Sequence, residues 1–243
     1  MSARSNLFSA GKRPLLCYVT DRRSLPGITP EKSVAALLEK IGQVADAGVD
    51  WVQIREKDLC GKELARLVRE AIRITREASP QASRRARILV NDRIDVAIAE
   101  GAGGAHLGEK SLPVAEAKRL SPAAEDFLLG VSCHSVETAQ AAAAGGADYI
   151  LFGPVFPTPS KAAYGEPQGL EHLAQVCQAT AVPVLAIGGI TPENAESCLE
   201  AGAAGIAAIR LFQDTPDPVP TIRRLHERLT DSRRRLPADQ KRE

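Results

Sequence analysis

Basic, amide and acidic side chains follow short apolar segments at several points of the sequence. Arg55 and Lys57 end one such segment, Asn91 and Asp92 end the next, and Lys161 follows a later one. Cations beside amide groups suit a diphosphate, because its oxygens accept many charge-assisted hydrogen bonds. Asp92 is a candidate ligand for Mg²⁺, which carboxylates and substrate phosphates commonly hold together. The alternative interpretation is that each charge only solvates a loop.

A second group of residues suits a phosphate monoester. Gly188-Gly189 follows an apolar segment and precedes Thr191-Pro192-Glu193, whose residue types are typical of a helix start. Backbone N–H groups near a helix start form a cradle for phosphate. Arg210 ends the next apolar segment and would add positive charge there. A tight turn without a ligand is the alternative interpretation of the glycine pair.

The histidines divide between candidate chemistry and structure. His134 ends an apolar segment and is a candidate general acid or base, because its pKa lies near neutrality. A hydrogen-bonded histidine at the end of a strand is the equal alternative. We expect His106 to be structural and His172 and His226 to lie on the surface of helices. Strand alternation turns Cys133 away from the side that His134 faces, which predicts a core residue.

Eight short apolar segments alternate with eight amphipathic ones. The apolar segments are continuous, as in parallel strands that are covered on both faces. This alternation predicts an α/β fold with a single (βα)₈ TIM barrel, whose functional groups lie at the carboxyl ends of the strands; an open doubly wound sheet is the alternative. We expect the barrel at residues 14–230, between flexible tails at 1–13 and 231–243. The expected strands are Leu15–Asp21, Trp51–Glu56, Arg87–Asp92, Gly104–Gly108, Phe127–His134, Tyr149–Phe156, Val182–Gly189 and Gly205–Phe212.

Composition excludes several classes of protein. The 243 residues are 44% hydrophobic and 25% charged, which is typical of a globular domain, and a net charge of +1 gives no field for nucleic acid or anionic lipid. No apolar run reaches the roughly 18 residues that a bilayer span needs, and the N-terminus lacks a secretory signal. The five scattered cysteines predict neither a disulfide framework nor a zinc site. We expect a cytoplasmic protein without membrane contact, whose partners are small phosphorylated substrates; a homo-oligomer is compatible with the sequence.

Seven motifs along the chain resemble the thiamine-phosphate synthase superfamily, which also contains the thiazole tautomerases. They span roughly residues 15–213, nearly the whole expected barrel, and each falls at the end of an expected strand. They are Tyr18-Val19-Thr20-Asp21, Gln53-Ile54-Arg55-Glu56-Lys57, Asn91-Asp92, His106-Leu107-Gly108, Gly130-Val131-Ser132-Cys133-His134-Ser135, Gly153-Pro154-Val155-Phe156-Pro157-Thr158-Pro159-Ser160-Lys161 and Ile187-Gly188-Gly189-Ile190.

The resemblance implies a reaction and a role for each matching residue. In the synthases, an aminopyrimidine methyl diphosphate loses pyrophosphate with the help of Mg²⁺, and the ring nitrogen of a thiazole phosphate traps the resulting cation. The implied diphosphate and pyrimidine ligands are Gln53, Arg55, Lys57, Asn91, Ser132 and Lys161. The implied thiazole phosphate ligands are Thr158, Ser160, Gly188, Gly189, Ile209 and Arg210. Mg²⁺ would bind at Asp92 and at the position of Ser111, and the implied catalytic residues are Arg55, Lys57, Ser132, His134 and Lys161.

The chain departs from the synthase pattern at two places. The synthases usually have Gln, an acidic residue and Asp after His-Leu-Gly, where this chain has Glu109, Lys110 and Ser111. Glu109 or Glu56 is a candidate substitute metal ligand, and Lys110 is a candidate replacement for part of the metal's charge. The synthases also usually have Ser where Arg210 stands.

These departures leave two alternative functions open. A thiazole tautomerase would aromatise the thiazole ring without metal, with His134 as its acid or base. A thiazole-phosphate binder without catalytic activity would keep only the Gly188-Gly189 site. The complete set of Arg55, Lys57, Asn91-Asp92 and Lys161 favours the synthase, because a tautomerase has little use for a diphosphate site.

Overall fold

A computed structural model describes residues 13–78, 85–122, 126–158 and 166–235, with side chains up to residue 231. Its eight strands are all parallel and form one closed barrel in chain order, which is completed where β8 pairs with β1. The predicted TIM barrel is therefore confirmed, and the open sheet is excluded. The strands are β1 (Leu15–Val19), β2 (Trp51–Ile54), β3 (Arg87–Asn91), β4 (Gly104–Leu107), β5 (Leu128–Cys133), β6 (Tyr149–Phe152), β7 (Val184–Ile187) and β8 (Gly205–Ala208).

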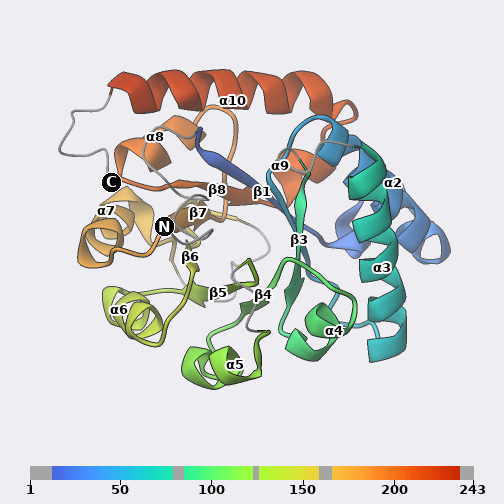
Figure 1. Cartoon of the computed structure of the whole chain (residues 1–243). Coiled ribbons are helices and arrows are strands. Elements are labelled where there is room, and N and C mark those ends of the chain that lie inside the picture. The colour runs from blue at the N-terminus through green and yellow to red at the C-terminus, as the bar shows by residue number, and fades with distance from the viewer. Residues whose placement is uncertain (1–12, 79–84, 123–125, 159–165, 236–243) are drawn as a thin grey trace.

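Helices surround this barrel on its outer side (Figure 1). Each of the first seven strands is followed by helical structure that returns the chain to the start of the next strand, as in βα units generally. The helices are α2 (Ser33–Asp46), α3 (Gly61–Ala78), α4 (Ile94–Ala99), α5 (Val114–Leu120), α6 (Val136–Ala144), α7 (Gly169–Ala179), α8 (Ala195–Glu200), α9 (Arg210–Gln213) and α10 (Pro218–Arg235), with short 3₁₀ helices η1 (Arg22–Ser24) and η2 (Pro30–Lys32). Among the residues that the structure describes, no helix has both the length and the apolar character to cross a bilayer.

The strands bury both of their faces. One set of side chains fills the inside of the barrel, where the rings of Trp51 and Tyr149 lie 4.8 Å apart. The other set packs outward against the helices. Gly130 leaves room for the interior rings, because a Cβ at this position would come within 2.0 Å of the Tyr149 ring. Continuous apolar strands, rather than alternating ones, follow from this double burial.

The end of the barrel differs from the sequence prediction. We expected the last strand to continue to Phe212, but it ends at Ala208, and Arg210–Gln213 form helix α9. The buried Gln213 accepts hydrogen bonds from the Tyr18 hydroxyl (3.0 Å) and the Asp21 N–H (2.9 Å). The chain must turn back over the barrel rim to make these bonds, which an extended strand would not allow.

Helix α10 also differs from the expected boundary, because it continues to Arg235 rather than ending at residue 230. Its buried residues Ile222, Leu225 and Leu229 keep the helical spacing up to the expected boundary. The helix continues for nearly two further turns past Leu229, into the segment expected to be a tail. Residues 1–12 and 236–243, which make up the rest of the two expected tails, lie outside the described residues.

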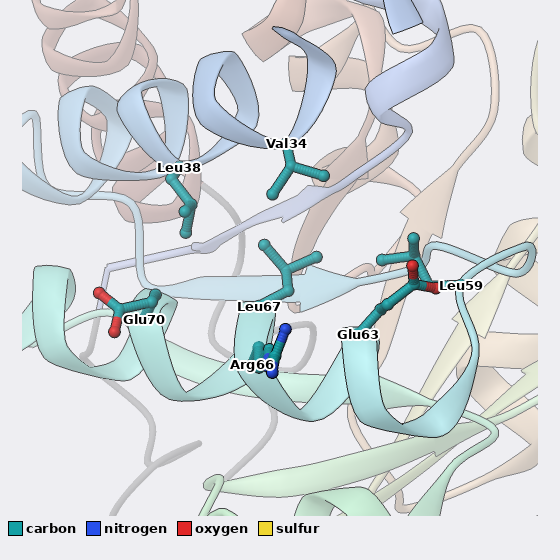
Figure 2. Close-up of a pocket in the computed structure, with 7 residues that line it drawn as sticks. All are labelled: Val34, Leu38, Leu59, Glu63, Arg66, Leu67 and Glu70. Carbon is teal, nitrogen blue, oxygen red and sulfur yellow. The ribbon is translucent and has the colours of Figure 1, made fainter. Parts of the chain in front are cut away.

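An apolar groove of about 230 Å³ lies between α2 and α3 on the outer wall of the barrel. Figure 2 shows Val34 and Leu38 of α2 pointing towards Leu67 of α3, with Glu63 and Glu70 along the same helix. The groove lies at the junction of two packed helices, and none of the predicted site residues lines it.

A polar cluster ties helix α10 to the amino ends of the strands. Asp50 pairs with Arg13 (2.8 Å) and accepts the N–H of Leu16 (2.9 Å), while His226 Nε2 donates to the carbonyl of Gly48 (2.9 Å). His226 Nδ1 is buried and has no hydrogen-bond partner in the described structure. The prediction that His226 lies on the surface is therefore wrong, whereas His172 is exposed as expected.

This cluster predicts a loss of stability in acid. Burial lowers the pKa of His226, against the hydrogen bond to Gly48, which raises it. As the pH falls through the ordinary pKa of histidine, about 6.5, the unfolded chain takes up a proton on this residue before the folded chain does, so the free energy of unfolding should fall as the pH falls. One proton gives a slope of at most about 1.4 kcal/mol per pH unit.

Urea unfolding at a series of pH values measures this slope, and His226→Gln should flatten it. His172→Gln is the matched control, because it removes an exposed histidine and should leave the slope unchanged. An unchanged slope in His226→Gln would contradict the assignment.

Candidate active site

A cavity of about 800 Å³ opens at the carboxyl ends of the strands. All eight strand ends contribute to its wall, which explains how residues far apart in the sequence meet there. The predicted site residues in its lining are Gln53, Arg55, Lys57, Asn91, Asp92, Ser111, Ser132, His134, Thr158, Gly188, Gly189, Ile209 and Arg210. The predicted residues Ser160 and Lys161 lie outside the described residues.

Four cations line this cavity: Arg55, Lys57, Lys110 and Arg210. In the described part of the chain, none of them forms an ion pair with a carboxylate. Arginines elsewhere commonly do, such as Arg22 with Asp58 at 2.6 Å. Cations left without acidic partners around one cavity favour an anionic ligand.

The segment after β2 presents its two cations to the cavity by turning Glu56 away from it. Glu56 is buried, accepts the Thr20 hydroxyl at 2.6 Å, and pairs with Arg22 at 3.0 Å. The Thr20 hydroxyl in turn accepts the N–H of Arg55 at 3.0 Å. Burial raises the pKa of Glu56, against the hydrogen bonds from Thr20 and Arg22, which lower it. Glu56 therefore does not line the cavity, and the expectation that it substitutes as a metal ligand is wrong.

Hydrogen-bonded side chains connect the ends of β2 and β3. Gln53 Nε2 donates to Asn91 Oδ1 (3.0 Å), and Asn91 Nδ2 donates to Asp92 Oδ2 (2.8 Å). The other end of the Gln53 amide, Oε1, is buried and has no hydrogen-bond partner among the described residues. A buried acceptor without a donor is costly, so this oxygen is a candidate contact for an N–H group of a ligand.

Asp92 is held as a carboxylate by several donors. It adopts a left-handed backbone conformation (φ 59°), and its Oδ1 accepts the Gly108 N–H (3.1 Å) and the Ser111 hydroxyl. Burial raises the pKa of Asp92, but the hydrogen bonds and the charge of Lys57 outweigh it and lower the pKa overall. Within the described residues, no three His, Cys, Asp or Glu side chains come together as a metal site. A divalent ion at Asp92 would thus need oxygens from a phosphorylated ligand, which is how Mg²⁺ is commonly held.

The residues at the end of β5 divide into a fixed serine and an accessible histidine. His106 bridges the Tyr149 hydroxyl (3.0 Å) and the Ser132 hydroxyl (2.9 Å), and burial lowers its pKa to about 3. It is therefore neutral and structural, as predicted, and it orients Ser132. His134 lines the cavity with Nδ1 against the Gly153 carbonyl and Nε2 4.0 Å from Glu109.

The prediction that Cys133 is a core residue is confirmed. Its side chain is buried on the face of the strand opposite to that of its sequence neighbours Ser132 and His134. Burial raises the pKa of the thiol to about 11, against a hydrogen bond with Thr138 that lowers it. A thiol with this pKa is almost fully protonated at neutral pH and is a poor nucleophile.

Gly188 and Gly189 form the turn after β7. Their φ angles are 95° and 66°, and a Cβ at Gly188 would come within 2.5 Å of Pro154. The Gly188 carbonyl accepts the Phe156 N–H (3.0 Å), and the Gly189 carbonyl accepts the Asn194 side chain (2.9 Å). Only glycine fits this fixed turn, which lies in the same cavity as Arg210.

Sequence reasoning left Asp21 open between a residue of the cavity mouth and a turn former and assigned no role to Ser24; both line the cavity. Glu109 and Lys110 line it too, although Glu109 was considered only as a substitute metal ligand and Lys110 only as a replacement for part of the metal's charge. The signal that could have found them is their position, because each follows a strand as the other site residues do.

Known proteins resemble this chain over most of its length. A family model described as thiamine monophosphate synthase matches residues 25–212. A Geobacter sulfurreducens protein that bears the name thiamine-phosphate synthase provisionally is 46% identical over 203 residues, which cover 84% of this chain and 88% of that protein. Thiamine-phosphate synthase of Chlorobium luteolum is 37% identical over 212 residues, covering 87% of this chain and 91% of that protein.

A solved structure agrees with these sequence matches. Thiamine phosphate pyrophosphorylase from Pyrococcus furiosus superposes with a TM-score of 0.74 at 31% identity, covering 90% of this chain and 96% of that one. The resemblance seen in the seven motifs is confirmed over the whole barrel: the chain belongs to the thiamine-phosphate synthase family.

Proposed function

We propose that this chain is a thiamine-phosphate synthase, a transferase that joins aminopyrimidine methyl diphosphate to thiazole phosphate and releases pyrophosphate. Family membership supports this function. The observation that carries it is a set of cations that form no ion pair among the described residues, around a cavity that is also lined by Gln53, whose Oε1 is buried without a partner in that part of the chain. One ligand that combines an anionic diphosphate with an aromatic amino group satisfies both features.

The diphosphate is assigned to the side of the cavity formed by β2 to β5. Arg55 and Lys57 supply charge there, while Asn91 and Ser132 supply neutral hydrogen-bonding groups. The amino group of the pyrimidine would donate to Gln53 Oε1. We also assign Lys161 to this group from its motif.

The thiazole phosphate is assigned to the opposite side, at β6 to β8. The Gly188-Gly189 turn offers backbone groups there, Arg210 supplies positive charge, and Thr158 adds a hydrogen-bonding side chain. Separate subsites would bring the ring nitrogen of the thiazole towards the methylene carbon of the pyrimidine. Ser160 is assigned to this side from its motif.

Mg²⁺ fits at Asp92, with Ser111 beside it as a neutral oxygen ligand. Bound together with the diphosphate, the ion would neutralise negative charge on the leaving group. The low pKa of Asp92 keeps this ligand charged at neutral pH. Glu109 remains a candidate further ligand, because it lines the same cavity.

The chain's own residues would lower the barrier mainly by electrostatics. The C–O bond to the diphosphate breaks, its electron pair leaves with pyrophosphate, and the nitrogen lone pair of the thiazole forms the new C–N bond. No proton has to move in this substitution. Arg55 and Lys57 are placed to stabilise charge that develops on the leaving group, and such fixed donors commonly contribute several kcal/mol.

A thiazole tautomerase is the second candidate, favoured by one observation. His134 Nε2 lies 4.0 Å from Glu109 inside the cavity, where a carboxylate could support proton transfer by the imidazole. This activity would need neither diphosphate nor metal.

One experiment separates these two functions. Purified protein receives both proposed substrates with Mg²⁺ or with EDTA, and product is measured by chromatography. Metal-stimulated formation of thiamine phosphate supports the synthase. Failure to form it, combined with ring aromatisation in EDTA that His134→Ala abolishes, would favour the tautomerase.

Two further expectations stay predictions, a cytoplasmic location and the absence of nucleic acid partners. The sequence is compatible with a homo-oligomer but does not fix the oligomeric state.

Replacing Arg55 should reduce catalysis strongly. Arg55→Gln removes one fixed cation from the leaving group, and kcat should fall about 10²- to 10³-fold, as for loss of one transition-state donor. Steady-state kinetics with matched unfolding curves measures this. Arg23→Gln is the control, because Arg23 is 72% exposed and lines no part of the cavity. Equal kcat values for Arg55→Gln and the unmodified chain would remove Arg55 from the mechanism.

Replacing Arg210 should affect one substrate only. Arg210→Ser removes a charge-assisted contact of roughly 1.5–3 kcal/mol, so KM for the thiazole phosphate should rise about 10- to 100-fold. KM for the pyrimidine diphosphate should stay within about twofold, because Arg210 lies at the other subsite. The control is Arg224→Ser, which changes an exposed residue of α10. Equal increases in both KM values would refute separate subsites.

A further inference from the structure

Lys110 lies at the tip of a turn that the structure holds in place. The Ser111 N–H donates to the Gly108 carbonyl (3.0 Å), and the Gly108 N–H donates to the Ser111 hydroxyl oxygen (2.8 Å). The Ser111 hydroxyl itself donates to Asp92. This turn follows β4, between β3 and β5, so it borders the side of the cavity assigned above to the diphosphate.

The charge of Lys110 has no acidic partner in the described structure. Its side chain is exposed and lines the cavity, as does that of Lys57. The neighbouring carboxylate, Glu109, comes within 4.0 Å of His134 instead. An exposed lysine without an acidic partner at the edge of a cavity is available to a ligand oxygen.

In the described part of the chain, few acidic groups surround Asp92, the candidate metal ligand. Asp92 already accepts hydrogen bonds on both carboxylate oxygens, from Gly108 and Ser111 on one and Asn91 on the other. The described residues add no cluster of three metal-binding side chains. Lys110 thus places a cation in the same turn that holds Ser111 against Asp92.

We propose that Lys110 is a further diphosphate-binding residue, whose charge replaces part of that of a divalent ion, so that this chain binds a diphosphate group even without metal. The inference rests on the proposed function, because it needs the diphosphate subsite. It adds that Mg²⁺ joins the site together with the diphosphate rather than before it. Turnover can still require the ion, because negative charge increases on the leaving group only when the C–O bond breaks.

Calorimetric titration of the full chain with inorganic pyrophosphate tests this proposal in EDTA and in Mg²⁺. In EDTA the unmodified chain should bind, and Lys110→Gln should raise Kd about tenfold, which corresponds to about 1.4 kcal/mol. Lys110→Arg should keep the affinity within about threefold. With Mg²⁺ present, the effect of Lys110→Gln should shrink. Lys62→Gln, which removes an exposed lysine from α3, is the matched control and should bind like the unmodified chain.

A second variant tests metal binding at Asp92 in the absence of catalysis. Ser111→Asp adds a carboxylate next to Asp92, so it should tighten binding of Mn²⁺ to the protein alone, as measured by electron paramagnetic resonance. It should also weaken binding of pyrophosphate in EDTA, because it adds negative charge to the subsite.

The outcomes separate this proposal from the proposed function. Equal pyrophosphate affinity of Lys110→Gln and the unmodified chain in EDTA would overturn the role of Lys110 alone. Binding by the unmodified chain only in Mg²⁺ would overturn binding without metal, yet leave the synthase intact. Absence of pyrophosphate binding under both conditions would overturn the diphosphate subsite and both proposals with it.

Discussion

Closure of the parallel barrel is the constraint on which the site depends. Pairing of β8 with β1 satisfies the last free strand edges and brings eight carboxyl ends to one rim. Residues as distant as Asp21 and Arg210 thereby share one cavity. An open sheet would separate the first strands from the last, and the two proposed subsites could not face each other. Burial of both strand faces keeps the rim rigid, so local loops can carry polar groups without loss of the core.

The local backbone at each strand end decides which side chains reach the cavity. In the segment after β2, Arg55 and Lys57 line the cavity, whereas Glu56 between them is buried against Thr20 and Arg22. Alternation along β5 buries Cys133 between Ser132 and His134. Glu56 thus contributes hydrogen bonds beneath the site, and Cys133 contributes to the core. In β5 the pleat turns successive residues to opposite faces, whereas after β2 the contacts of Glu56 with Thr20 and Arg22 hold it away from the cavity.

The sequence was sufficient to predict the barrel and most of the cavity lining, because apolar strands and the polar residues at their ends are local signals. The errors have a common physical origin in contacts between distant segments. Gln213 folds the end of the barrel into α9 by bonding to Tyr18 and Asp21, nearly the whole chain away. His226 is drawn into a half-buried cluster by Gly48 and Asp50, which lie far from it in the sequence. No periodicity within α9 or α10 encodes such partners.

Two kinds of polar group in the cavity lining lack a partner among the described residues, cations and a buried amide oxygen, and each has an energetic cost without a ligand. The cations on the rim form no ion pair among the described residues, and the buried Gln53 Oε1 has no hydrogen-bond donor there. Several arginines away from the cavity pair with acids, such as Arg69 with Glu100 and Arg73 with Glu70. A ligand that supplied both anionic oxygens and an N–H donor would relieve both costs at once. Binding would then stabilise the fold as well as prepare the reaction, since a ligand held only by the folded state shifts the folding equilibrium towards it.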